Sequence, residues 1–174
     1  MQHRIRIALF AVPLLAFLSG GIVFAQTGAD ARARNLPLVE VYKNPYCGCC
    51  GGWVAHMEKA GFTVKVHEVE DLAPLRKRLG IPDEHASCHS AKVGAYALEG
   101  HVPADDVKRL LTEKPQAIGL VVPGMPAGSP GMEIPSGAAE PYASLLLKRD
   151  APTEVYVRHE NQESADKRQK SKAK

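Results

Sequence analysis

Three cysteines lie within four positions of one another near the start of the chain, in the segment PYCGCCGGW at residues 45–53. They are Cys47, Cys49 and Cys50, and the only other cysteine is Cys88. Residues before the segment alternate as in a strand, and residues after it repeat as in a helix. The positive end of a helix dipole, with its free N–H groups, lowers the pKa of a thiol. Since thiolate is both the nucleophilic and the metal-binding form, we expect redox exchange, metal binding or both here.

Redox exchange is favoured by the C-x-x-C spacing of Cys47 and Cys50. Cys47 would be the exposed attacking thiol and Cys50 the resolving thiol, one helical turn later. Cys49 is an extra thiol inside the motif and would compete for resolution. Four cysteines in an exported chain could also form two structural disulfides. However, a bridge within residues 47–50 closes almost no loop and adds little stability.

Metal binding is favoured if Cys88 meets the other three cysteines, because four thiolates suit soft ions. Zinc normally takes its thiolates as two separated C-x-x-C pairs. Here three cysteines are close together, two of them adjacent, and the fourth is distant in the chain. Binding all four to a single tetrahedral ion would strain the loop at residues 47–50. Several Cu(I) ions that share bridging sulfurs would avoid that strain. We therefore expect copper as Cu(I), with zinc as the alternative and an iron–sulfur centre third.

Additional ligands are predicted in two places. Met125 and Met132 lie in a loop rich in Pro and Gly, and their thioethers are soft ligands for Cu(I), although both could equally pack under the loop. His89 follows Cys88 and could act as an extra ligand, a proton donor or a hydrogen-bond partner of a ligand. His101 lies at a predicted turn and is a less favourable candidate.

The elements that must position these residues alternate as in an α/β protein. We expect strands at 38–42, 62–69, 92–98 and 118–122, helices at 51–61, 72–80 and 102–115, and a terminal hairpin from 144–148 and 153–159. The segment 123–136 is too rich in Pro and Gly for regular structure. The pattern predicts a thioredoxin-like sandwich with a C-terminal β-hairpin and a long Pro/Gly loop. In such a fold Cys88 would face Cys47 and Cys50, in the loop that usually holds a cis-proline.

The domain organisation follows from composition. Residues 1–25 have the basic start, apolar run and small final residues of a secretory signal, which we expect to be cleaved after Ala25. An uncleaved membrane anchor is the alternative, but the run is barely long enough to span a bilayer and contains Pro13. The rest divides into a flexible lead-in (26–36), a thioredoxin-like metal-binding domain (37–159) and a disordered basic tail (160–174).

The charge balance gives no indication of a polyanionic partner. The chain has 22 Lys and Arg against 19 Asp and Glu, and two of the arginines lie in the signal. A nearly neutral mature chain does not suggest nucleic acid or an acidic substrate as a partner. We expect no membrane contact beyond the signal peptide.

Over roughly residues 38–158 the chain resembles the CopG-type family of small periplasmic metal-binding proteins, formerly described as a domain of unknown function, and four segments carry the resemblance. The segments are residues 41–62, 87–111, 119–137 and 155–159. The resemblance implies a thioredoxin-like periplasmic domain that binds copper through a cysteine cluster and acts in copper tolerance. Carried over by position, the implied ligands are Cys47, Cys49, Cys50 and Cys88, and the methionines match the family's PGM-x-x-GSPGM segment.

Three functions are therefore open to this sequence. The first is an exported Cu(I)-binding protein, with other periplasmic copper-handling proteins as partners and with copper/thiol oxidoreductase activity as an additional property. The second is a thiol–disulfide oxidoreductase without metal. The third is a binding module for another protein that is stabilised by zinc.

Overall fold

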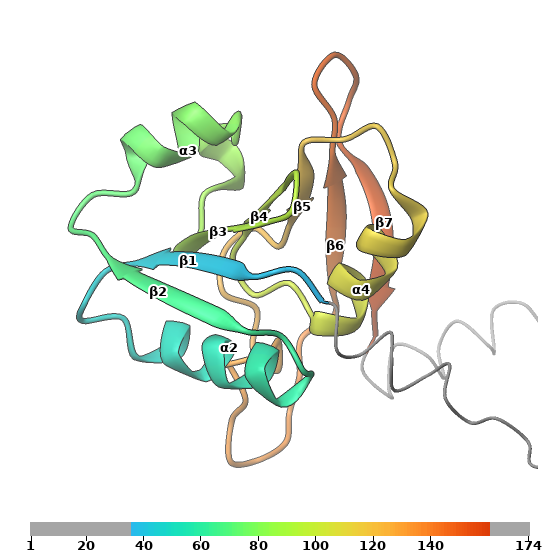
Figure 1. The fold of residues 1–174 in the computed structure, drawn as a ribbon. Helices are drawn as coiled ribbons and strands as arrows, with labels where there is room; N and C mark the ends of the chain where they lie inside the picture. Colours follow the sequence, from blue (N-terminus) through green and yellow to red (C-terminus); the bar gives the residue numbers. More distant parts are fainter. Residues whose placement is uncertain (1–35, 161–174) are drawn as a thin grey trace, which may run out of the picture.

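The computed structural model describes residues 36–160, in which helices cover both faces of one seven-stranded mixed sheet (Figure 1). In chain order the elements are β1 (Val39–Lys43), α2 (Gly48–Lys59), β2 (Val64–Glu68), α3 (Ala73–Leu79), the 3-10 turn η1 (Asp83–His85), β3 (His89–Val93), β4 (Tyr96–Glu99), α4 (Ala104–Glu113), β5 (Gly119–Val121), β6 (Tyr142–Leu147) and β7 (Glu154–His159). The predicted signal peptide and nearly all of the lead-in and basic tail lie outside the described residues. Within residues 36–160, no helix has the length and apolar character that a bilayer span requires.

The strand order in the sheet is β2-β1-β3-β4-β5-β6-β7. β1 runs parallel to β2, and β4 runs parallel to β5. The remaining neighbours are antiparallel, including the C-terminal hairpin of β6 and β7. The predicted α/β class, the hairpin and the Pro/Gly loop are confirmed, whereas the thioredoxin-like assignment stays a prediction.

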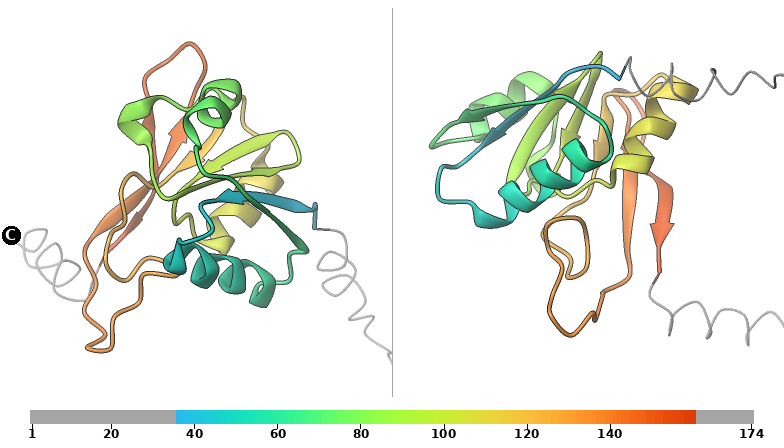
Figure 2. Two further views of the ribbon diagram at one scale, coloured as in Figure 1. Left: turned by 90° about the vertical axis from the view of Figure 1, so that its left-hand side faces the viewer. Right: turned by 60° about the horizontal axis from the view of Figure 1, so that its bottom comes forward.

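Strand alternation divides the core between the two faces of the sheet. On one face, Leu120 and Leu146 pack in the cluster that includes Trp53 of α2 and Val107 of α4. On the other face, the next residues along β5 and β6 pack in a smaller cluster that includes Leu79 of α3. Figures 1 and 2 show the same division, with α2 and α4 on one side of the sheet and α3 on the other.

The prediction of a single strand at residues 92–98 is wrong. β3 ends at Val93 and β4 begins at Tyr96, and these two residues pair across a tight antiparallel hairpin. Gly94 has φ 57°, a left-handed conformation that glycine adopts readily and that two-residue hairpin turns require. Because apolar residues flank this glycine on both sides, the turn looks like a continuous strand in the sequence.

Helix α2 begins three residues earlier than predicted, at Gly48 instead of Gly51. Cys49 and Cys50 therefore belong to its first turn, and Cys47 is its N-cap residue. The shift matters because it places these thiols in the first helical turn, at the positive end of the helix dipole, rather than in a preceding loop.

Candidate metal centre

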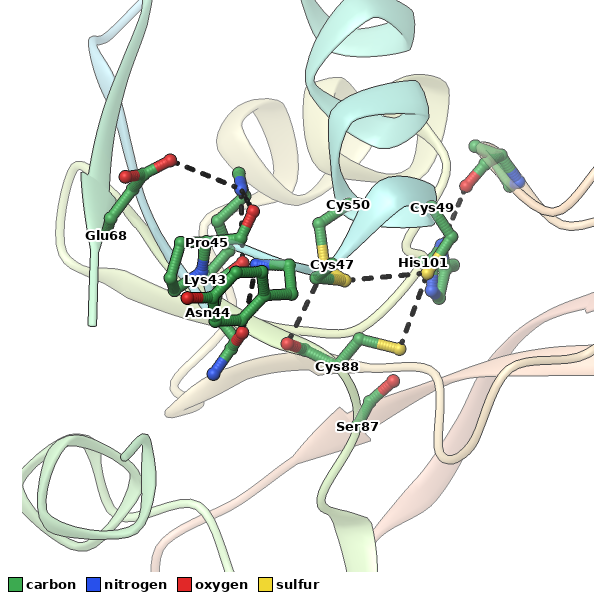
Figure 3. Close-up of a disulfide and its surroundings, with 12 residues drawn as sticks. Lys43, Asn44, Pro45, Cys47, Cys49, Cys50, Glu68, Ser87, Cys88 and His101 are labelled. Atoms are coloured by element: carbon green, nitrogen blue, oxygen red, sulfur yellow. Dashed lines mark hydrogen bonds and ion pairs between the residues drawn. A yellow bond between two sulfur atoms is a disulfide. The ribbon is translucent and has the colours of Figure 1, made fainter. Parts of the chain in front are cut away.

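A turn after β1 delivers the first cysteine to the start of α2. The Asn44 carbonyl accepts a hydrogen bond from the Cys47 N–H at 3.0 Å, and the Asn44 side-chain oxygen accepts one from the Tyr46 N–H at 3.0 Å. Cys47 has extended backbone angles and makes no side-chain capping hydrogen bond. Its sulfur is therefore not used to cap the helix, and it points to the neighbouring cysteines (Figure 3).

All four cysteines meet at this helix start. Their sulfur atoms lie within 4.8 Å of one another, although Cys88 comes from the segment before β3. The Cys49 sulfur is 3.6 Å from the Cys47 sulfur and 3.8 Å from the Cys88 sulfur (Figure 3). The Cys50 sulfur is 3.6 Å from the Cys88 carbonyl oxygen. The structure thus brings together the four residues that the sequence singled out.

Two of the four cysteines are oxidised. Cys47 and Cys50 form a disulfide, whereas Cys49 and Cys88 are free thiols. The bridge joins the pair with C-x-x-C spacing, which is the pair expected for thiol–disulfide exchange. A set of four thiolates therefore becomes available only after two electrons and two protons have reduced this bridge to thiols and the thiols have ionised.

Burial disfavours the charged form of the free thiol of Cys88, just before β3. Burial, together with the nearby Cys49, raises the pKa of Cys88 from 9.0 to about 11. At neutral pH Cys88 is therefore protonated, and a metal ion must displace this proton to bind the sulfur. In the reduced protein, a bound soft cation would offset the negative charge of the four thiolates.

His89, the residue after Cys88, is fully buried. Its ring centroid is 4.5 Å from that of Trp53, whose Nε1–H donates to the Val102 carbonyl at 2.8 Å. Neither ring nitrogen of His89 makes a hydrogen bond of normal geometry within the described part of the chain, although the Gly100 backbone lies near enough to the ring to oppose the lowering of its pKa. Burial and the neighbouring His101 lower the pKa of His89 to about 3, so the ring is neutral at physiological pH.

His101 is a second buried imidazole, 5.0 Å from His89 between ring centroids. Its Nδ1 lies 2.8 Å from the Pro130 carbonyl oxygen, which fixes this nitrogen as the donor, because a carbonyl only accepts. The Nε2 atom then carries a lone pair, and it has no partner in residues 36–160. A metal-binding histidine commonly has this arrangement, with one nitrogen donating to a carbonyl and the other left to bind.

The sequence gives little weight to His101 because the hydrogen-bond partner of its ring, Pro130, is distant in the chain. The sequence shows only the turn at Gly100 before His101. Nothing in it indicates that the Pro130 carbonyl will accept a hydrogen bond from the His101 ring. His56, which lies on α2, has a structural role instead. Its Nε2 accepts a hydrogen bond from the Ala104 N–H at 3.0 Å and so caps α4. Burial lowers the pKa of His56, which keeps it neutral and able to accept.

The Pro/Gly loop packs directly against the cysteine turn (Figure 2). A Cβ atom on Gly131 would lie only 2.6 Å from the Cys49 carbonyl oxygen, and one on Gly52 only 2.8 Å from the Gly131 Cα. Two glycines are therefore needed for this approach. Met132 follows Gly131 and is half-buried, whereas Met125 is 54% exposed. Both methionines belong to a segment that touches the site, and their role as ligands stays a prediction.

Comparison with known proteins gives two findings. Residues 85–132, which include Cys88, His89 and both loop methionines, match a family described as a protein of unknown function, DUF411. Two solved structures, named copper resistance protein CopG form 1 and form 2, each share 36% sequence identity with this chain and have a TM-score of 0.68. Each match covers 72% of this chain and 99% of the other.

No curated protein matches the sequence. The identity and coverage of the two structures confirm the resemblance that the cysteine, histidine and Pro/Gly motifs suggested. The chain belongs to the family of the copper resistance protein CopG.

Proposed function

We propose that the protein binds Cu(I) in the cluster of Cys47, Cys49, Cys50 and Cys88 and acts in copper tolerance. The observation that carries the proposal is the convergence of four sulfurs within 4.8 Å from two separate segments. Sulfur donors favour Cu(I). Shared sulfurs can bridge several Cu(I) ions, whereas a single tetrahedral ion would strain the loop that carries three of the cysteines. The name of the two similar structures supports copper as the metal.

His89 and His101 extend this proposed site with nitrogen ligands. Both are neutral and buried, His89 directly follows Cys88, and His101 lies near Cys49 (Figure 3), while three of their ring nitrogens make no hydrogen bond of normal geometry among residues 36–160. Met125 and Met132 are the remaining candidates, because the loop that carries them packs on the first turn of α2. Zinc is the alternative metal, and the protein would then be a zinc-stabilised module.

A second function, thiol–disulfide exchange, is favoured by the Cys47–Cys50 bridge. If copper is the electron donor for this exchange, two Cu(I) ions would each give one electron to the Cys47–Cys50 disulfide. The disulfide bond breaks, two thiolates form, and two Cu(II) ions result. The protein would then be a copper/thiol oxidoreductase as well as a copper-binding protein. Without metal, the same two electrons would come from an external dithiol, which becomes a disulfide.

The proposed location is the periplasm, reached through the signal at residues 1–25, where other copper-handling proteins would be partners. The evidence for this location is the sequence of the signal, which lies outside the described residues. Expression with and without residues 1–25, followed by fractionation of the cells, tests it. Retention of the full chain in the cytoplasm would contradict it.

Anaerobic reconstitution tests the metal proposal. The reduced protein is loaded with Cu(I), freed of excess metal and analysed for copper and zinc. We expect more than one copper per chain and a large loss in Cys88→Ser. Fewer than one copper per chain, unchanged by that substitution, would contradict the proposal, and tight binding of zinc alone would favour the zinc module. Disulfide turnover that needs Cys47 but survives loss of Cys49 and Cys88 would favour the oxidoreductase without metal.

A further inference from the structure

The residue before Cys88 has each of its polar groups in contact with a different element. The Ser87 N–H donates to Oε1 of Glu99 on β4 at 2.7 Å. Its hydroxyl donates to the carbonyl oxygen of Gly124 in the Pro/Gly loop at 2.5 Å. Its own carbonyl oxygen lies 3.5 Å from Nη1 of Arg76 on α3. Ser87 is therefore fixed from three directions, directly beside Cys88 (Figure 3).

Glu99 is the centre of this arrangement, and its side chain is fully buried. Its Oε1 accepts from Ser87 and lies 3.5 Å from Arg76 Nη1, while its Oε2 accepts from the Ser90 hydroxyl at 2.5 Å. A buried carboxylate is unfavourable unless it is paired and hydrogen-bonded. Replacement by an apolar residue would avoid this cost, so core packing alone does not explain why a glutamate is present.

Cys88 itself has few restraints on its side chain. It lies between the short turn η1 and the first residue of β3, and its sulfur is 3.8 Å from that of Cys49. Because the position of a Cβ follows from the backbone, fixing Ser87 also fixes where the Cys88 sulfur can lie. The geometry thus links a buried ion pair to the placement of one cysteine.

We propose that Glu99 and Arg76 are positioning residues that act through Ser87 to hold Cys88 opposite Cys49. The Ser87 hydroxyl also connects this segment to Gly124, the residue before Met125. As an account of copper binding, this inference rests on the proposed function. As an account of how two sulfurs are kept adjacent, it is independent of copper.

A thiol-bridging probe tests the placement without copper. In the oxidised protein only Cys49 and Cys88 are free, and a monosubstituted trivalent arsenical, such as phenylarsine oxide, binds tightly only when two thiols can bridge one arsenic atom. The arsenic forms two As–S bonds, and the two thiol protons leave with the displaced oxygen as water. Loss of tight binding in Cys49→Ser and in Cys88→Ser shows that the probe reports this pair.

Glu99→Ala removes the acceptor for the Ser87 N–H, and we expect the arsenical to bind about tenfold more weakly, as when an outer-shell partner of a metal ligand is lost. Glu99→Gln keeps an acceptor at the same position and should restore most of the affinity. Removing the negative charge alone would favour the Cys88 thiolate and strengthen binding. The sign of the change therefore separates positioning from electrostatics.

The matched control is Ser90→Ala, which removes a hydrogen bond to the other oxygen of Glu99 and leaves the bond to Ser87. We expect its affinity to stay within about twofold of the original. If Glu99→Ala does not fold, Ser87→Ala provides the second variant, and a loss of about threefold is expected because only the tie to Gly124 is removed. Thermal unfolding confirms that each variant is folded.

Unchanged affinity in Glu99→Ala or Ser87→Ala would overturn the inference, and so would an equal loss in Ser90→Ala. Failure of the proposed function has a different signature. If the reduced protein binds no copper while the arsenical results hold, the positioning account stands and the copper proposal fails. If copper binds but the arsenical affinity does not depend on Glu99, the positioning account alone fails.

Discussion

Two histidine-containing clusters within residues 36–160 differ in how their polar atoms are satisfied and in burial, because His89 and His101 are fully buried whereas the His159 side chain is 24% exposed. In the cluster of Asp106, Ser144 and His159, between α4 and the C-terminal hairpin, the carboxylate accepts from both neighbours. The Ser144 hydroxyl donates to Asp106 Oδ2 at 2.5 Å, and His159 Nε2 lies 2.8 Å from the same oxygen. This site is complete as it stands, and it joins the hairpin to the helix.

The second cluster, His89 and His101, has one hydrogen bond of normal geometry for four ring nitrogens within residues 36–160. Burial of an unpaired polar group is unfavourable, and native proteins rarely retain such groups without a reason. His159, with Asp106 as its carboxylate partner, therefore holds the C-terminal hairpin against α4. The proposed copper site gives His89 and His101, which leave three ring nitrogens unpaired in the described chain, a reason to be retained.

The largest effect is expected from the complete cluster. Asp106→Ala leaves Ser144 and His159 without their acceptor, so the free energy of unfolding should fall by about 2–3 kcal/mol. Asp106→Asn keeps an acceptor and should lose less. Urea unfolding measures both variants, and copper per chain should be unchanged in each. Loss of copper from a folded Asp106→Asn protein would break the distinction between the two clusters.

Acid should destabilise the protein through the incomplete cluster. Below pH 6.5 a histidine in the unfolded chain binds a proton, whereas burial keeps His89 neutral in the folded protein down to about pH 3. The unfolded state thus binds more protons in this window, and stability is lost as pH falls. Between pH 6.5 and 5 the loss should reach about 2 kcal/mol for one such histidine.

Urea unfolding at several pH values measures this loss, with His89→Leu as the matched variant. The substitution removes the titrating group, so its stability should depend less on pH. Burial also lowers the pKa of His101 and of His56, and the slope that remains in the variant should come from them. An identical slope in His89→Leu and the original protein would contradict the assignment.

Copper affinity should respond to the nitrogen that has no partner. His101→Leu fills the same space without a ligand, and we expect about tenfold weaker Cu(I) binding, which equals about 1.4 kcal/mol. Competition with a Cu(I) chelator under anaerobic conditions measures the affinity. The control is His159→Leu, whose copper affinity should not change. If both substitutions weaken binding equally, the two clusters are not functionally different.

The smallest effect is expected at His56, whose nitrogen already has a backbone partner. His56→Ala removes the acceptor at the start of α4 and should reduce the free energy of unfolding by about 1 kcal/mol. Lys59→Ala, an exposed position on the same helix, should change it by less than about 0.5 kcal/mol. Copper binding should be unaffected in both, and a loss in His56→Ala alone would place this histidine in the metal centre.

Much of the fold was predictable because its elements have strong local patterns. Alternation identified β1 and β2, and helical spacing identified Trp53 and Met57 as buried residues of α2. The exception is the turn at Gly94, where a backbone conformation available to glycine interrupts a run that is apolar on both sides. The local pattern contains no polar turn residue there, so it could not reveal the hairpin.

The cysteine site was predictable in part for a similar reason. Three ligand candidates are adjacent in the sequence, and placing Cys88 opposite them required only an assumption about the fold. His101 and Glu99 could not be assigned, because their roles depend on Pro130 and Ser87, which the tertiary structure brings to them. The oxidised Cys47–Cys50 pair follows the C-x-x-C spacing that the redox alternative already used.

The most direct test of the central claim is the metal content of the protein purified anaerobically from cells that express and export it. The account predicts copper in excess of zinc, with more than one copper per chain, and no bound copper when Cys47, Cys49, Cys50 and Cys88 are all serine. Abundant zinc without copper, or copper that survives removal of the four cysteines, would contradict it.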